Sequence, residues 1–105
     1  MTVITTVLYP AGSTFNLDYY LSTHMPLVSK IWGPFGLKDW KVVKYTTENA
    51  QFTYGAFLTW ENSEDSNRAV AAAEAKPIFD DIPNFSDRPP SFASGDVVGS
   101  WEAGN

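Results

Sequence analysis

The chain contains one histidine, and helical spacing turns that residue inward. His24 lies in residues 15–32, FNLDYYLSTHMPLVSKIW, where apolar side chains recur every three or four positions, as in an amphipathic helix. The apolar stripe consists of Leu17, Tyr20, Leu21, His24, Leu27 or Val28, and Ile31. An inward imidazole can exchange a proton with a bound phenol or ketone near neutral pH. The same spacing also fits a core histidine that hydrogen-bonds a backbone carbonyl.

Three aromatic side chains are candidates for binding a substrate beside this histidine. Tyr20 precedes His24 by one helical turn, so the two share a face and the phenol can orient the imidazole or a substrate oxygen. Phe79 and Phe85 flank the turn of the segment PIFDDIP and are candidates for a pocket wall. Ordinary packing is the alternative for each of these rings. Tyr19 is expected to project toward the edge of the helix.

Other groups with catalytic potential are few. Asp80 and Asp81 are adjacent, and neighbours on a helical turn point about 100° apart, so they are interpreted as a solvated helix end rather than a catalytic pair. There is no cysteine, and no ligand-spaced cluster accompanies the histidine, so no metal site is expected. The sequence GPFG lacks the strand-to-helix context of a phosphate loop. We therefore predict a protein without a metal or a cofactor.

The first predicted strand and the helix that follows it determine the position of His24. Residues 2–9, TVITTVLY, are rich in β-branched side chains and stop before a proline, which predicts a strand. The helix that carries the histidine follows, with Asn16 as its N-cap. Pro26 cannot donate a backbone hydrogen bond, so the helix is expected to kink at His24 or to restart just after it.

The remaining elements complete the pattern. Residues 37–47 and 52–61 are typical of two strands joined as a hairpin. A second helix is expected to be capped by Ser63 and to end or bend at Pro77. Residues 91–101 form the last predicted strand. The order β-α-β-β-α-β predicts an α+β fold, a ferredoxin-like sandwich with a four-stranded antiparallel sheet and two helices on one face.

The first and third strands are apolar on both faces. In the first strand, Thr5, Val7 and Tyr9 alternate with Ile4, Thr6 and Leu8. In a monomer with this fold, the outer face of the sheet is exposed to solvent and is expected to be polar. The pattern therefore favours a homodimer in which a second sheet covers the outer face, although a slightly hydrophobic exposed sheet is the alternative.

Length and charge limit the partners. The chain of 105 residues suits one domain, residues 1–105. Its formal net charge of -5 opposes binding to nucleic acid. No stretch is long and apolar enough to cross a membrane, and the N-terminus lacks the basic start of a signal peptide, so the cytoplasm is the expected location.

The whole pattern resembles the EthD family of dimeric α/β barrels. The resemblance rests on FNLDYYLSTHMPLV, followed by FDDIPNFSDRPP and a closing GDVV, and it covers nearly the whole chain. The family usually has aspartate at the position of Asn16, and both residue types cap helices. The resemblance implies that two four-stranded sheets pair into an α/β barrel, with a small-molecule pocket between sheet and helices in each subunit.

Two functions remain open. One is a cofactor-independent enzyme of an oxidative or aromatic, polyketide-type pathway, in which His24 transfers a proton on a small hydrophobic or aromatic compound. The resemblance implies oxidoreductase-associated, dehydratase or decarboxylase chemistry. The other is a non-catalytic binding or accessory protein that carries a hydrophobic pathway intermediate. Whether the chain is an enzyme at all is left open.

Overall fold

One four-stranded sheet organises the chain. The computed structural model describes residues 1–104; Asn105, the end of the predicted domain, lies outside the described residues. The strands are β1 (Val3–Pro10), β2 (Leu37–Lys44), β3 (Phe52–Trp60) and β4 (Ser91–Asp96). They lie in the order β2-β3-β1-β4, and each neighbouring pair is antiparallel. The predicted α+β ferredoxin-like fold is confirmed, including the hairpin of β2 and β3.

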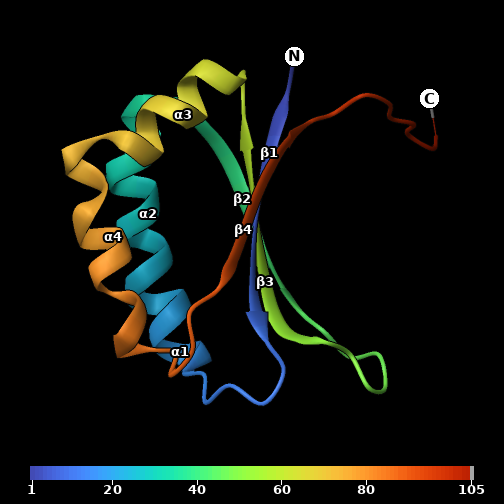
Figure 1. The fold of residues 1–105 in the computed structure, drawn as a ribbon. Coiled ribbons are helices and arrows are strands. Elements are labelled where there is room, and N and C mark those ends of the chain that lie inside the picture. Colours follow the sequence, from blue (N-terminus) through green and yellow to red (C-terminus); the bar gives the residue numbers. More distant parts are fainter. Residues whose placement is uncertain (105) are drawn as a thin grey trace.

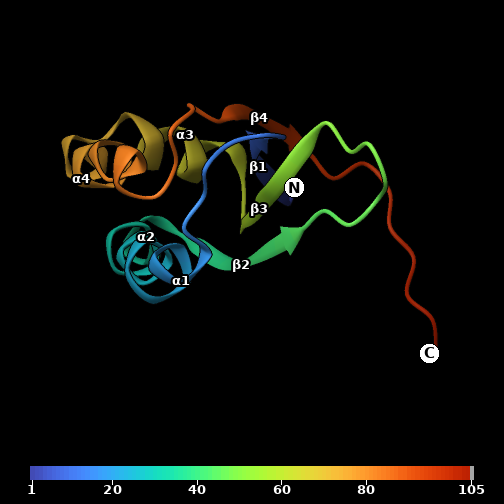
Figure 2. The same ribbon diagram turned by 90° about the horizontal axis from the view of Figure 1, so that it is seen from below.

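Two helical rods cover one face of this sheet, and the opposite face is open (Figure 1). The first rod consists of α1 (Leu17–Tyr19), a π-helical turn and α2 (Met25–Trp32). The second rod contains α3 (Ser63–Ala71) and α4 (Lys76–Asp80). Seen from below, the first rod lies on the β2 side of the layer and the second on the β4 side (Figure 2).

The predicted kink beside Pro26 takes the form of a π-helical turn, Tyr20–His24. The N–H of Met25 bonds the carbonyl of Tyr20, five residues back, and Pro26 then occupies the first turn of α2, where a missing N–H costs little. The wide turn shifts the buried stripe. Leu21, expected inside, is 42% exposed, whereas Met25 is buried.

The second rod breaks earlier than the sequence indicates. Its cap is Asn62 rather than Ser63, because the side chain of Asn62 accepts the N–H of Asp65 at 2.9 Å. The helix was expected to run to Pro77, but Ala72 leaves the helical region with ψ of 145°. Pro77 instead lies in the first turn of α4. Proline has no backbone N–H to donate, so it fits the first turn of a helix but not the interior of a longer one.

The last strand is shorter than predicted. It was expected to span residues 91–101 but ends at Asp96, which pairs with Val3 at the start of β1. Only one further bond, from the N–H of Val97 to the carbonyl of Thr2 at 2.8 Å, continues the pairing. Beyond this point β1 offers no partner, so the tail leaves the sheet (Figure 1). Trp101 in this tail is 84% exposed.

The two sheet faces differ in their cover, as the alternation predicts. Thr5, Val7 and Tyr9 are buried beneath the rods. On the open face, Thr6 lies opposite both Phe57 and Ala93, and Leu8 lies opposite Gly55. Gly55 leaves room for the ring of Tyr45, because a β-carbon at this position would come within 2.9 Å of the Tyr45 hydroxyl. The open face is thus largely apolar.

Candidate functional site

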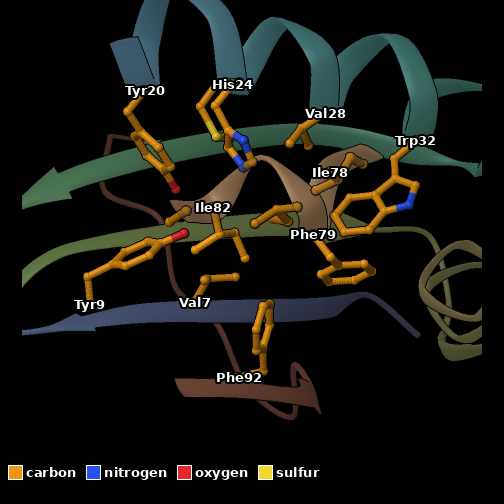
Figure 3. A pocket seen from close by; sticks show the side chains of 13 residues that line it. Val7, Tyr9, Tyr20, His24, Val28, Trp32, Ile78, Phe79, Ile82 and Phe92 are labelled. Atoms are coloured by element: carbon orange, nitrogen blue, oxygen red, sulfur yellow. The ribbon is translucent and has the colours of Figure 1, made fainter. Parts of the chain in front are cut away.

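A small cavity lies between the sheet and the two rods (Figure 3). Its volume is about 20 Å³, room for about one water molecule. The lining residues are Val7, Tyr9, Tyr20, His24, Met25, Val28, Trp32, Ala56, Leu58, Ile78, Phe79, Ile82 and Phe92. Four of them, Tyr9, Tyr20, His24 and Trp32, carry polar side-chain groups, and the indole N–H of Trp32 donates to the carbonyl of Ala69 at 3.0 Å. The cavity is therefore an apolar chamber with the polar groups of Tyr9, Tyr20 and His24 near one end (Figure 3).

His24 reaches this chamber from the π-helical turn. His24 is 4% exposed, so its imidazole is buried in the protein interior, as predicted. The ring of Tyr20 stacks on it, with centroids 5.3 Å apart and an angle of 13° between the planes. Phe85 packs against it at 4.5 Å. These two rings fix the plane of the imidazole.

Asp81 holds the imidazole from the second rod. Its Oδ2 atom lies 2.9 Å from Nδ1 of His24, and the Asp81 side chain is only 11% exposed. The interpretation of Asp80 and Asp81 as a solvated helix end is therefore wrong for Asp81. It describes Asp80, whose carboxylate is 59% exposed and pairs with Lys76. Because the two side chains point apart, one faces solvent and the other reaches the histidine.

Two further donors hold the carboxylate of Asp81. The hydroxyl of Tyr19 donates to Oδ1 at 2.5 Å, and the amide of Asn84 donates to the same oxygen at 2.9 Å. Tyr19 was expected to lie at the edge of the helix. It is half-buried, and its hydroxyl reaches across to the second rod. Asp81 is thus bonded on both oxygens and cannot rotate freely.

This arrangement determines the protonation of the pair. Burial lowers the pKa of His24, and the attraction of Asp81 does not overcome this effect. Burial alone would raise the pKa of Asp81, but hydrogen bonds from Tyr19, Asn84 and His24 lower it below its ordinary value. An ionised carboxylate only accepts hydrogen bonds, so Nδ1 of neutral His24 carries the proton. Nε2 is then the basic nitrogen available to a ligand.

Two phenols complete the polar end of the cavity. The hydroxyls of Tyr9 and Tyr20 point toward one another (Figure 3). Burial raises the pKa of both phenols far above the ordinary value, and their mutual interaction adds to the effect at Tyr9. Both hydroxyls therefore stay protonated at any physiological pH, and because they hydrogen-bond each other, one of the two protons is left for a ligand.

The structure brings together three of the four predicted site residues at the cavity. His24, Tyr20 and Phe79 line it. Phe85 is placed differently: it packs behind the imidazole and the Tyr20 ring and is not among the lining residues. Sequence reasoning missed Asp81, Tyr19 and Asn84. The sequence signal for Asp81 was its adjacency to Asp80. Neighbouring side chains on a helical turn point in different directions, so one of the two carboxylates can face inward and pair with a histidine that is distant in sequence.

Residues 1–104 contain no clustered set of metal-ligating side chains. Within this part of the chain, no three His, Asp or Glu side chains are grouped so that they could hold a metal ion. None of its helices has the length and hydropathy needed to span a bilayer.

The sheet order and the two rods on one face define a ferredoxin-like α+β protein, which has a small cavity between sheet and helices. No protein-family profile and no curated protein sequence matches the chain. Among solved structures, it is similar to an EthD-like protein from Ralstonia eutropha JMP134, with a TM-score of 0.80, 25% identity and 95% of each chain covered.

Two further structures extend this likeness. An ethyl tert-butyl ether D (EthD) family protein from Bacillus halodurans C-125 has a TM-score of 0.74 and 24% identity, with 93% of this chain and 100% of that chain covered. A dimeric ferredoxin-like protein from Jannaschia sp. CCS1 has a TM-score of 0.65 and 10% identity, with 91% and 98% covered. The chain therefore has the fold of the EthD family, as its sequence motifs predict.

Proposed function

We propose that the protein takes up a small, largely apolar molecule with an acidic hydroxyl or an enolisable ketone, and that His24 removes a proton from it without a cofactor. The observation that carries this proposal is the 2.9 Å hydrogen bond between His24 and Asp81 at an apolar cavity. It holds a neutral imidazole with Nε2 ready to accept a proton. Tyr19 and Asn84 hold the Asp81 carboxylate in place, which supports a role for Asp81 in orienting the imidazole.

The surroundings of His24 suit the anion that forms. The proton passes from the O–H or C–H group of the substrate to Nε2, and the negative charge remains on the substrate oxygen. The pair of Tyr9 and Tyr20 hydroxyls stabilises this charge by donating the one proton that their mutual hydrogen bond leaves free. The apolar walls keep water away from the phenolate or carbanion. Dehydration or decarboxylation of an aromatic or polyketide-type substrate is the class of reaction that such an anion enters.

The likeness to EthD-like proteins supports a small organic ligand, since the name of one neighbour refers to ethyl tert-butyl ether. A second candidate function is a carrier that binds the same kind of molecule without converting it. The two phenols favour this candidate, because as neutral donors they also bind an intact ketone or phenol. Turnover separates the enzyme from the carrier.

The proposal includes a homodimer. The open sheet face carries Ile4, Leu8 and Phe57 at half-buried positions, and two such faces brought together would form a closed apolar interior between the sheets. The dimeric state of the ferredoxin-like protein from Jannaschia supports this arrangement. The chambers beside His24 lie on the other side of each sheet and would stay separate.

Phenol and toluene test the proposal as a matched pair of nearly equal size. We expect phenol to bind at least about tenfold more tightly, because toluene would leave the polar groups of the cavity without partners. The nitrogen NMR signals of the single imidazole report the event, since phenol bound at Nε2 shifts them. Equal affinity for the two probes, or an unchanged imidazole spectrum with phenol bound, would contradict the proposal.

A further inference from the structure

The cavity beside His24 is too small for the ligand that its chemistry suits. It measures about 20 Å³, whereas an engineered protein cavity that takes up benzene measures about 150 Å³. A ligand with even one ring must therefore displace side chains when it enters. The question is which part of the wall gives way.

A second hollow adjoins the cavity at one end. This outer groove has a volume of about 370 Å³ and is lined by Thr5, Val70, Phe79, Phe92, Ala93 and Ser94. Phe79 and Phe92 are the two residues that line both the cavity and the groove. Their rings meet edge to face, with centroids 6.1 Å apart. The two rings thus stand between the interior chamber and the surface.

These two rings are also the least buried rings of the chamber wall. Phe92 lies on β4, an edge strand whose residues are all exposed, and its own residue is 51% exposed. Phe79 is half-buried in α4, a helix of five residues. The other aromatic residues of the wall, such as Tyr9, Tyr20 and Trp32, are at most 4% exposed. An exposed side chain such as Phe92 can change rotamer without a change in the backbone.

The groove outside the pair suits an apolar extension of the ligand. Val70 is 45% exposed there, so the groove offers apolar surface to solvent. Its hydroxyls are already engaged: the side chains of Thr5 and Ser94 bond each other at 2.8 Å, and Thr5 also accepts the indole N–H of Trp60 at 3.1 Å. Such a surface rewards burial of hydrocarbon rather than of charge.

We infer that Phe79 and Phe92 form the entrance gate of the site, and that the natural ligand is elongated. Its hydroxyl or keto end lies at His24, its body passes between the two rings, and an apolar extension of at least one further ring fills the outer groove. This inference rests on the proposed function, because His24 fixes the position of the polar end. It makes Phe79 and Phe92 determinants of ligand length.

Phenol and biphenyl-4-ol test the inference, since they share the hydroxylated ring and differ by one ring in line with it. We expect the parent protein to bind biphenyl-4-ol at least about tenfold more tightly than phenol, because the second ring buries its surface in the groove. Val70→Trp fills the groove and should remove this advantage while leaving the affinity for phenol within about twofold, since Val70 does not line the chamber.

Stopped-flow measurements then test the gate. Phe92→Ala should raise the association rate of phenol several-fold and weaken biphenyl-4-ol. Trp101→Ala, which removes an exposed aromatic ring of the tail, is the matched control and should change neither quantity. Three results would each overturn the inference and leave the proposed function standing. The first is equal affinity of the parent protein for phenol and biphenyl-4-ol, and the second is an equal loss of affinity for both probes in Val70→Trp. The third is an unchanged phenol association rate in Phe92→Ala. Failure of both probes to bind would overturn the proposed function, and the inference with it.

Discussion

Nδ1 of His24 lies 2.9 Å from Oδ2 of Asp81, which follows it by 57 residues in the sequence. The two side chains come from different helical rods, so the basic nitrogen is aligned only when the second rod is docked. The carboxylate fixes the tautomer of the imidazole and leaves Nε2 to the ligand. Most of the behaviour expected of this protein follows from this hydrogen bond.

His24→Gln removes the proton acceptor and keeps most of the size of the side chain. For an enzyme we expect the variant to fold, dimerise and bind phenol, and to lose about 10²-fold or more in turnover of a phenolic or enolisable substrate. For a carrier, affinity and release should stay close to those of the parent. Melting temperature, affinity and turnover, measured on this one variant, separate the two. Full turnover in a stable variant would contradict a role for His24 in proton transfer.

Asp81→Asn removes the charge that fixes the tautomer. The amide can donate to Nδ1 and so place the imidazole proton on Nε2, the wrong nitrogen for a base. We expect turnover to fall by at least about 10²-fold, with a smaller effect on ligand affinity. The neighbouring Asp80→Asn is the matched control, because Asp80 is exposed and pairs only with Lys76. Equal losses in the two variants would show that Asp81 does not position His24.

Stability should fall in weak acid because of the same pair. The folded-state pKa of His24 is lowered from 6.5, so the unfolded chain binds the proton more readily. This contribution to stability is complete above about pH 6.5 and is lost as the pH falls through the lowered pKa, by about 1.4 kcal/mol for each pKa unit of difference. The lowered pKa of Asp81 acts in the same direction at still lower pH, below 3.8.

Melting curves recorded from about pH 7.5 to about pH 5 measure this loss. The chain has no other histidine, so His24→Gln should flatten the profile over that interval. The remaining slope in the variant is the control for carboxylates. An equal slope in both proteins would mean that the pKa of His24 is not lowered in the folded state.

Pro26→Ala tests the π-helical turn. The alanine restores an N–H at position 26, which allows the turn to close into an ordinary α-helix and rotates His24 away from Asp81. We expect weaker phenol binding with a modest change in stability. A crystal structure of the variant shows the ring directly. An unchanged His24–Asp81 distance together with unchanged affinity would mean that Pro26 does not shape the site.

Phe57→Asp tests the homodimer. It places a charge in the centre of the open sheet face, where a dimer would bury on the order of 1,500 Å² in total. Light scattering with gel filtration should give twice the chain mass of 11.6 kDa for the parent and the chain mass for the variant. Lys30→Asp, on the exposed surface of α2, is the control and should remain dimeric. A monomeric parent at micromolar concentration would contradict the proposed assembly.

Much of the fold was predictable because its signals are local. Alternation in residues 2–9 and 52–61 defines strands with two apolar faces, and helical spacing turns His24 inward. The errors arise where a local rule competes with a distant partner. Asp96 ends the last strand only because β1 begins opposite it, at Val3. Leu21 is exposed because one wide turn shifts the helical register.

The partner of His24 was beyond such rules. Asp81 reaches the histidine because the second rod breaks at Ala72 and α4 begins at Lys76, with Pro77 in its first turn. Neither the break nor the resulting direction can be derived from the spacing of Asp80 and Asp81. The hydroxyl of Tyr19 likewise finds its acceptor on an element that is distant in sequence.

The neighbour order β2-β3-β1-β4 has a consequence during protein synthesis. Within this sheet, β4 leaves the ribosome after the other three strands, yet it pairs with β1, which is made before them. Until residues 91–96 emerge, β1 keeps a free edge and the chamber lacks the wall that Phe92 supplies. A chain that stops before Ser91 would therefore present both an unpaired strand and an open apolar chamber, which together favour aggregation and clearance by the cell.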